Sequence, residues 1–348
     1  MQQRIDKLFG TGIDGTVFIS GFANIFYYSG FTSADAYLLL TPVANYIITD
    51  SRYFVQARLE SPDFELIDIK KGWEYVFGLT ESEQIFFEED NLNYGMYKKL
   101  SPKAHGKEFV PAQSKIDFPR QKKDKRELEI IKDAEKIGDM AFAHILDYLH
   151  AGVSEREIAF ELEMFMRKSG ASGLSFETIV ASGVRSAMPH GVASDKFIET
   201  GDFVTLDFGC RYKGYCSDMT RTVVIGKADS KQKEIYDIVL KAQTTALASL
   251  KNGISCSDVD KIARDIITDA GYGENFGHSL GHSVGIELHE MPVFSPKSTD
   301  TLQNGNVLSV EPGIYIDGWG GVRIEDLIAV SDCEVINLTN SPKELIVI

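Results

Sequence analysis

The chain has 348 residues, of which 43% are hydrophobic and 25% charged, and its formal net charge at neutral pH is −15. This composition is typical of a globular protein with a sizeable core, and the length suits two domains better than one. The acidic balance, with no basic patch beyond a short QKKDKR segment, excludes nucleic acid and acidic membrane surfaces as partners.

Targeting and redox features point to the cytoplasm. The start, MQQRIDKLFG, lacks the charged and then apolar pattern of a signal peptide. No apolar stretch approaches the ~20 residues that span a membrane. The four cysteines, Cys210, Cys216, Cys256 and Cys333, form no CxxC pair, which predicts reduced thiols in a reducing compartment.

The first third of the chain alternates β-rich and helical runs. Two segments predict helices, RYFVQARLES (52–61) and NYGMYKKLSP (93–102). Short apolar runs bounded by Gly, Pro, Asn and Asp predict strands, and these are GTVFIS (15–20), AYLLLT (36–41), NYIITD (45–50), FELIDI (64–69) and QIFFEE (84–89). Strands alternating with helices indicate an α/β domain built on a central sheet.

The composition changes near residue 112, where a polar, proline-marked stretch precedes a long amphipathic helix. The polar stretch places a domain boundary at about residue 120, which gives domains 1–120 and 121–348. Gly152 is the expected stop of the long helix. Apolar residues recur along it at helical spacing, at Leu128, Ile131, Ala134, Ile137, Met140, Ala141, Ile145 and Leu149.

The second domain repeats one order of elements without repeating its residues. The first half predicts helices at 126–150 and 154–169, followed by strands near 176–180, 203–209 and 215–225. The second half predicts helices at 231–252 and 256–270, followed by strands near 307–316 and 321–330.

Two acidic residues stand in the segment VTLDFGCRYKGYCSDMTRTVVIG. A glycine-containing turn joins its two β-rich runs, which predicts an antiparallel hairpin. Asp207 ends the first run and Asp218 starts the second, so the hairpin can aim both carboxylates at one point. A buried carboxylate is costly unless it is paired or bound to a metal. The alternative is that both aspartates are turn residues.

Three of the seven histidines, His278, His282 and His289, fall within GHSLGHSVGIELHEMP. Imidazole is a common metal ligand and a proton carrier near neutral pH. The glycines of this segment allow backbone or ligand to approach closely. Hydrogen-bonded core or turn histidines are the alternative interpretation.

Two glutamates lie in the apolar segment VLSVEPGIYIDGWGGVRIEDLIAV. Glu311 ends one β run before a Pro-Gly pair, and Glu325 lies inside another. Glutamates flanked by Val, Ile and Leu are rarely left unpaired. A salt bridge from Glu325 to Arg323 is the alternative. With the aspartates and one imidazole they form a hard O/N ligand set that suits divalent ions such as Mn, Co, Fe or Zn, and four carboxylates fit a two-metal centre.

At these motifs, residues 121–348 resemble the metallopeptidases that include methionine aminopeptidases, prolidases and aminopeptidases P, which share the "pita-bread" fold with its pseudo-twofold repeat. The resemblance implies a ligand order filled here at every position. LDFG and SDMTRT supply the two aspartates, GHSLGHSVG the histidine, and VEPG and RIED the two glutamates: Asp207, Asp218, His282, Glu311 and Glu325. It also implies two divalent ions per chain, with Mn expected first and Co or Zn as alternatives.

The same resemblance assigns further roles. His190, in MPHGVASDK, matches a histidine near the scissile nitrogen, and His289 matches one that contacts the substrate carbonyl or developing oxyanion. Glu311 is the expected general base, Arg323 is expected to support the metal carboxylates, and His278 matches a supporting histidine of the proline-specific branch.

The first 120 residues carry NIFYYSGF and ITDSRYFVQA, which look like the N-terminal domain of prolidases and aminopeptidases P. We therefore expect an exopeptidase that removes the residue in front of a proline, acts on short peptides and forms a homodimer. Val293, where many prolidases carry Arg, favours an Xaa-Pro aminopeptidase. A dipeptide-restricted prolidase is the alternative, and a non-catalytic binding protein on the same fold is a distant one.

Overall fold

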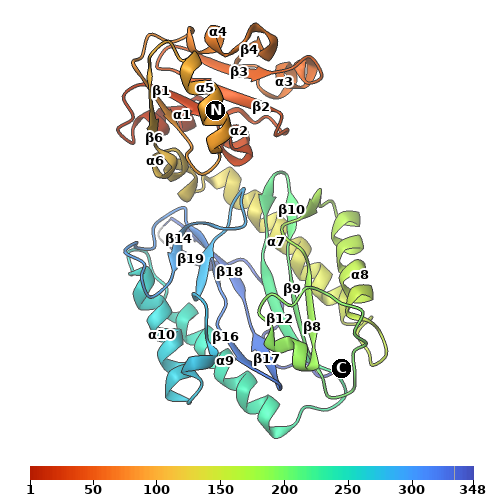
Figure 1. Cartoon of the computed structure of the whole chain (residues 1–348). Coiled ribbons are helices and arrows are strands. Elements are labelled where there is room, and N and C mark those ends of the chain that lie inside the picture. Colours follow the sequence, from red (N-terminus) through yellow and green to blue (C-terminus); the bar gives the residue numbers. More distant parts are fainter. Residues whose placement is uncertain (333) are drawn as a thin grey trace. The chain divides into compact units, whose positions relative to one another are not determined.

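The computed structural model describes residues 1–332 and 334–348, and it divides into two compact units, Met1–Arg120 and Gln121–Ile348. Figure 1 traces both along the chain. No helix in the described part of the chain combines the length and apolarity that crossing a bilayer requires.

The first unit is a six-stranded mixed sheet with helices between its strands, in the order β4-β3-β2-β1-β5-β6. Strands β1, β2 and β3 pair antiparallel, while β1–β5, β3–β4 and β5–β6 pair parallel. The strands are β1 (Thr16–Ile19), β2 (Ala36–Leu40), β3 (Asn45–Thr49), β4 (Glu65–Asp68), β5 (Gln84–Phe87) and β6 (Glu108–Pro111). The helices are α1 (Gln2–Phe9), α2 (Phe22–Ser29), α3 (Phe54–Glu60), α4 (Trp73–Phe77), α5 (Tyr94–Leu100) and α6 (Gln113–Asp117).

All five strands predicted in this region are present, as are the two predicted helices. Helix α2 was not predicted, because its sequence FANIFYYS is aromatic and apolar almost throughout and carries no helical periodicity. Its polar members are instead buried and bonded; Asn24, for example, donates to the carboxylate of Glu88 at 2.7 Å.

The second unit contains two helix pairs, each followed by strands, as the sequence order predicts. The helices are α7 (Lys125–Ile145), α8 (Glu155–Lys168), α9 (Ser230–Ser249) and α10 (Cys256–Asp269). Capping boxes at Asp124, Ser154 and Asp229 start α7, α8 and α9. Helix α7 ends at Ile145 rather than near Gly152, because turns follow at residues 146–148 and 151–152, and Met140 on it is 39% exposed.

Among the described residues, the strands of this unit form four small sheets, with the orders β11-β10-β7, β12-β9-β8, β14-β13-β15-β18-β19 and β16-β17. The first-half strands are β7 (Gly173–Leu174), β8 (Ile179–Ser182), β9 (Phe203–Phe208), β10 (Cys210–Tyr212), β11 (Tyr215–Cys216) and β12 (Met219–Val224). The second-half strands are β13 (Gly281–Ser283), β14 (Glu290–Phe294), β15 (Val307–Val310), β16 (Gly313–Ile316), β17 (Gly320–Arg323), β18 (Asp326–Ser331) and β19 (Glu334–Asn337).

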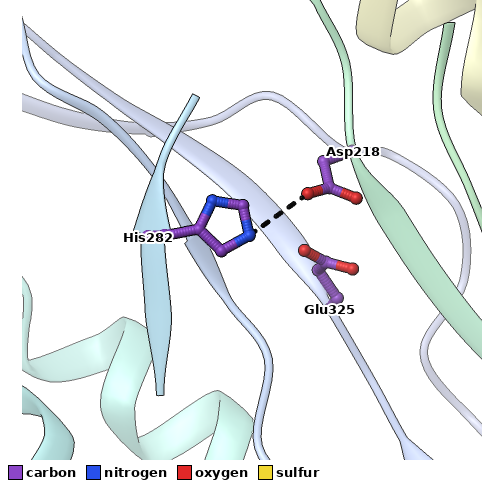
Figure 2. A group of neighbouring side chains, drawn as sticks. All are labelled: Asp218, His282 and Glu325. Carbon is purple, nitrogen blue, oxygen red and sulfur yellow. Dashed lines mark ion pairs between the residues drawn. The ribbon is translucent and has the colours of Figure 1, made fainter. Parts of the chain in front are cut away.

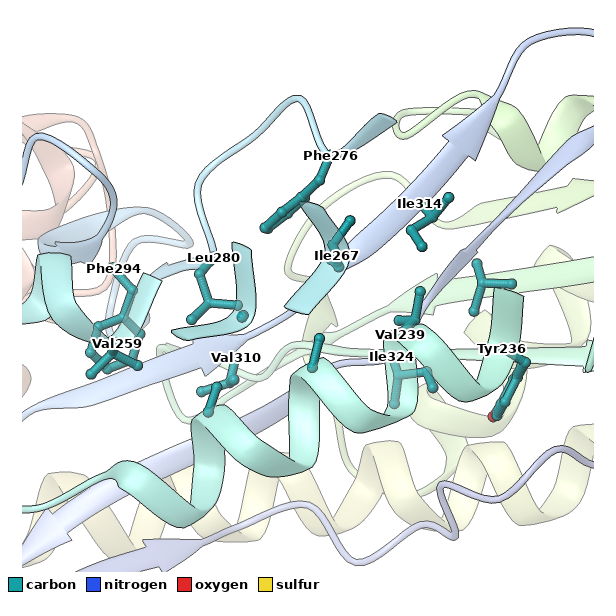
Figure 3. Close-up of a cluster of buried hydrophobic side chains, with 14 of the residues drawn as sticks. Tyr236, Val239, Val259, Ile267, Phe276, Leu280, Phe294, Val310, Ile314 and Ile324 are labelled. Atoms are coloured by element: carbon teal, nitrogen blue, oxygen red, sulfur yellow. The ribbon is translucent and has the colours of Figure 1, made fainter. Parts of the chain in front are cut away.

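Helices α9 and α10 are held against the second-half strands by a buried apolar cluster (Figure 3). Tyr236 and Val239 of α9 and Val259 of α10 are each at most 1% exposed, and they belong to one cluster with Val310 and Ile314. Burying one such side chain contributes about 1.5–3 kcal/mol. This packing fixes the strands on which the polar side chains described below are placed.

The thiols of Cys210, Cys216 and Cys256 are free and buried, while Cys333 lies outside the described residues. Burial raises the pKa of both Cys210 and Cys256 to about 12. It also raises the pKa of Cys216. These three thiols are therefore protonated at neutral pH and unreactive while they stay buried.

Candidate metal centre

The second unit encloses a cavity of about 520 Å³. The nine residues singled out from the sequence all line it, namely His190, Asp207, Asp218, His278, His282, His289, Glu311, Arg323 and Glu325. They come from separate strands and loops, and only the fold brings them together.

The two aspartates come from the predicted antiparallel pair. Strand β9 pairs with β12 in a register that sets Asp207 opposite Thr220, and Asp218 lies directly before β12. Asp207 is therefore a strand residue and not a turn residue. Its Oδ2 accepts from the Nη2 of Arg323 at 2.5 Å, so Arg323 pairs with an aspartate and the alternative pairing with Glu325 is wrong.

Each glutamate occupies a break in what the sequence predicted as one continuous strand. Glu311 lies between β15 and β16, and Glu325 lies between β17 and β18. Strands β15 and β18 belong to the five-stranded sheet, whereas β16 and β17 form a separate pair. Where the chain passes from one sheet to the other, hydrogen bonds to other segments hold its backbone. Glu311 N donates to Leu280 O, and Glu325 N donates to Thr220 O.

Asp218, His282 and Glu325 each present a ligand atom, and these atoms all lie within 4.8 Å of one another (Figure 2). His282 Nε2 is 3.5 Å from Asp218 Oδ2 and 3.4 Å from Glu311 Oε1. Its Nδ1 faces the carbonyl of Ser283 at 3.2 Å, which places the proton of a neutral ring on Nδ1. The unprotonated Nε2 then points its lone pair at two carboxylates.

The surroundings of these side chains disfavour negative charge on the carboxylates. Burial, followed by the neighbouring carboxylates, raises the pKa of Asp218 and of Glu325 well above the ordinary carboxylate value. Burial likewise raises the pKa of Glu311, and it lowers the pKa of His282. The three carboxylates are therefore disfavoured in their charged forms, which a cation among them would reverse, and His282 is neutral, the form that binds a metal.

Two buried carboxylate oxygens without a hydrogen-bond partner in the described part of the chain test whether a divalent ion fits this site. Asp207 Oδ1 and Glu325 Oε1 are buried and have no hydrogen-bond partner among the described residues. A buried carboxylate oxygen without a donor is costly. Four carboxylates, a bare imidazole nitrogen and a second imidazole nitrogen tied to a backbone carbonyl match the way proteins hold hard divalent ions. The residues present fit such ions.

Behind the carboxylates, Arg323 and His278 are linked through Tyr315, which the sequence did not suggest. Arg323 Nη1 donates to the Tyr315 hydroxyl at 2.8 Å, and that hydroxyl lies 3.0 Å from His278 Nε2. His278 Nδ1 faces the carbonyl of Ser279 at 2.8 Å, so its Nε2 accepts from the tyrosine. Burial lowers the pKa of His278. Tyr315 lies within β16, and no sequence signal marks it.

The remaining two histidines are exposed to the cavity. The ring of His289 lies 4.3 Å from the ring of His282, centroid to centroid. Burial, then the nearby His282 and His190, lower the pKa of His289, so it is neutral at neutral pH. The lining also includes apolar side chains, namely Phe176, Ile179, Val192, Leu288 and Val293.

The chain matches two known families along nearly its whole length. Residues 129–332 match metallopeptidase family M24, and residues 2–122 match the Creatinase/Prolidase N-terminal domain. An Xaa-Pro dipeptidase of Pyrococcus horikoshii is 42% identical over 331 residues, which cover 95% of this chain and 94% of that protein.

Two solved structures share the whole architecture. An Xaa-Pro dipeptidase from Bacillus anthracis superposes with a TM-score of 0.95 at 43% identity, covering 100% of this chain and 99% of that one. An X-Pro aminopeptidase from Thermotoga maritima superposes with a TM-score of 0.90 at 40% identity, covering 97% and 98%. These likenesses confirm the two-part fold, including the pita-bread unit, that the sequence implies.

Proposed function

Because this chain belongs to metallopeptidase family M24, we propose that it is an Xaa-Pro dipeptidase, which cleaves the bond in front of proline in a dipeptide. The chain is a metallo-exopeptidase that works with divalent ions. The sequence favoured an aminopeptidase, but relatives near 40% identity that span the whole chain are named Xaa-Pro dipeptidase, and they support the dipeptidase instead.

The observation that carries the proposal is the cluster of buried carboxylates around His282, in a cavity that apolar side chains also line. We infer that Asp207, Asp218, His282, Glu311 and Glu325 hold two divalent ions, with Mn first among the candidates. When bound, such ions polarise a carbonyl and acidify water. A metal pair suits an Xaa-Pro bond because proline has no N–H by which a protease could position it.

Residues of the chain itself can accept and donate the protons of the reaction. Glu311 Oε1 accepts from the Ser309 hydroxyl at 2.9 Å. Burial raises the pKa of Glu311, which makes it a competent general base. The imidazoles of His289 and His190 both line the cavity and can donate N–H groups into it. We assign His289 to the oxygen of the attacked carbonyl, His190 to the proline nitrogen, and the apolar side chains of the lining to the proline ring.

One observation favours the aminopeptidase as a second candidate. A dipeptidase must recognise a free carboxylate next to the scissile bond. Among the described residues that line the cavity, Arg323 is the only lysine or arginine. Its donors already reach Asp207, Thr220, Tyr315 and the carbonyl of Pro189.

The test compares kcat/KM for Met-Pro with that for Met-Pro-Ala, using Mn-loaded protein and Met-Ala as the non-proline control. A dipeptidase prefers Met-Pro, and an aminopeptidase cleaves the tripeptide at least as well. Failure to cleave either substrate would remove the proposal. Metal analysis checks the two-ion stoichiometry, and light scattering checks the proposed homodimer against the chain mass of 38.7 kDa.

A further inference from the structure

A lysine and a glutamate form a fully buried ion pair beside the cavity without lining it. Lys123 Nζ lies 2.9 Å from Glu290 Oε2, and the two side chains are 1% and 3% exposed. Glu290 opens β14 and directly follows His289. A buried ion pair is weak evidence for stability, because apolar residues of similar volume often stabilise as well. Stability alone therefore does not explain why this ion pair lies beside the cavity.

The glutamate end of the pair shapes the turn that carries His289. A side chain at Gly285 would clash with Glu290 Oε2, so the carboxylate lies directly against that backbone. Glu287 N donates to Glu290 Oε1 at 3.3 Å, and Gly285 N donates to Glu287 O at 3.0 Å. The carboxylate thus sits under the 285–290 turn and bonds to its backbone.

The lysine end is fixed to a different part of the unit. Lys123 N donates to Gly305 O at 2.7 Å, and Asn306 Nδ2 donates to Gln121 O at 2.9 Å. Lys123 thereby connects the segment before α7 to the turn before β15 through its backbone, and to the 285–290 turn through its ammonium group. A long side chain fixed at its backbone and at its ammonium group has little freedom left, so it sets the position of Glu290.

We propose that Lys123 and Glu290 are positioning residues for His289. The inference rests on the proposed function, which gives His289 a contact with the reacting carbonyl. His289 is exposed to the cavity, so the backbone of its turn must set its position. Catalysis depends on such placement, since a displacement of about 1 Å can lower a rate by roughly a hundredfold.

A double-mutant cycle tests this inference. The neutral pair Lys123→Met/Glu290→Gln is made in the wild-type chain and in His289→Ala, so that no buried charge is left unpaired. Full-length, Mn-loaded proteins are compared on Met-Pro for kcat, KM, metal content and thermal midpoint. The control is Lys261→Met/Asp265→Asn, which removes an exposed ion pair of α10.

We expect the neutral pair to lower kcat by roughly tenfold or more, with KM and metal content unchanged. In the His289→Ala background the same change should lower kcat by less than about twofold, because the group it positions is gone. Lys123→Arg, which keeps the ion pair, should recover most of kcat. The control pair should leave all four quantities unchanged.

Equal losses in both backgrounds, or a parallel loss of metal, overturn the inference and leave a purely structural pair. Wild-type turnover in His289→Ala also overturns it, while the dipeptidase activity stands. Absence of Met-Pro hydrolysis by the wild-type chain is instead a failure of the proposed function. Should the neutral pair not fold, the single variant Glu290→Gln replaces it in both backgrounds and is judged by the same criterion. This variant keeps an oxygen for the ammonium of Lys123.

Discussion

Glu325→Gln should make the metal-free protein more stable and abolish its stabilisation by metal. In the wild-type chain Glu325 Oε2 accepts from the Thr220 hydroxyl at 2.7 Å, while Oε1 is buried without a partner among the described residues. Glutamine keeps an oxygen for Thr220 and brings an NH2 group toward the neighbouring carboxylates.

The size of the effect follows from that exchange. A hydrogen bond to a charged group contributes about 1.5–3 kcal/mol, and here it replaces a repulsion. In a domain of 150–250 residues, 1 kcal/mol shifts Tm by about 2–4 °C, so the metal-free Tm should rise by roughly 3–12 °C. Added Mn at about 100 times Kd should stabilise the wild type by ~2.7 kcal/mol and the variant not at all.

The dependence on pH has a definite sign. Burial, then Glu311 and Asp207, raise the pKa of Glu325 above its ordinary 4.5. Above pH 4.5 the folded, metal-free chain therefore holds more protons than the unfolded chain, and its stability falls as pH rises toward the raised pKa. Glu325→Gln removes this contribution to the slope.

The assay is thermal unfolding of chelator-treated protein from pH 5 to 8, repeated with Mn. Glu234→Gln, at an exposed position of α9, is the matched control and should change nothing. A metal-free Glu325→Gln protein less stable than wild type would refute the reasoning, because repulsion would then not dominate the site.

Three further outcomes are expected. His289→Ala should keep its metal and lose roughly 10²–10³ in kcat, measured by steady-state kinetics beside metal analysis; a parallel fall in metal content would make His289 a ligand. Tyr315→Phe should destabilise the fold by about 1–3 kcal/mol in thermal unfolding, since it leaves Arg323 and His278 without their shared hydroxyl. Replacing the substrate proline by alanine should lower kcat/KM by about thirty- to a thousandfold, because the flat ring fills an apolar pocket at little cost in ordering; equal rates on Met-Ala and Met-Pro would count against proline specificity.

Local patterns predicted most of the fold. Five of the six strands of the first unit and both helix pairs of the second follow from alternation, helical spacing and turn residues, while β6 (Glu108–Pro111) was not predicted. The errors have local causes. Helix α2 was missed because it is aromatic and apolar almost throughout and shows no helical periodicity, and α7 was drawn past Ile145 because apolar residues continue into the turn beyond it. Strand β13 is three residues long and carries too little pattern to detect.

The cavity residues were predictable because metal chemistry restricts residue types at fixed motifs. Their geometry was not. Glu311 and Glu325 read as strand residues, yet both lie where the chain leaves one sheet for another. The pairing of Arg323 with Asp207 joins positions 116 residues apart, and that of Lys123 with Glu290 joins positions 167 apart. Such partners are set by tertiary packing, on which short motifs carry no information.

The buried thiol of Cys216 gives the protein a built-in reporter. Cys216 N donates to Gly285 O at 2.8 Å, and its Sγ lies 3.6 Å from Ile286 O, so β11 lies directly against the turn that leads to His289. A reagent can alkylate this sulfur only when the turn lifts away. The rate of alkylation under native conditions therefore measures the free energy of opening that turn, separately from global unfolding. Substrate analogues that engage His289 should slow the labelling of Cys216 and leave that of Cys256, the first residue of α10, unchanged.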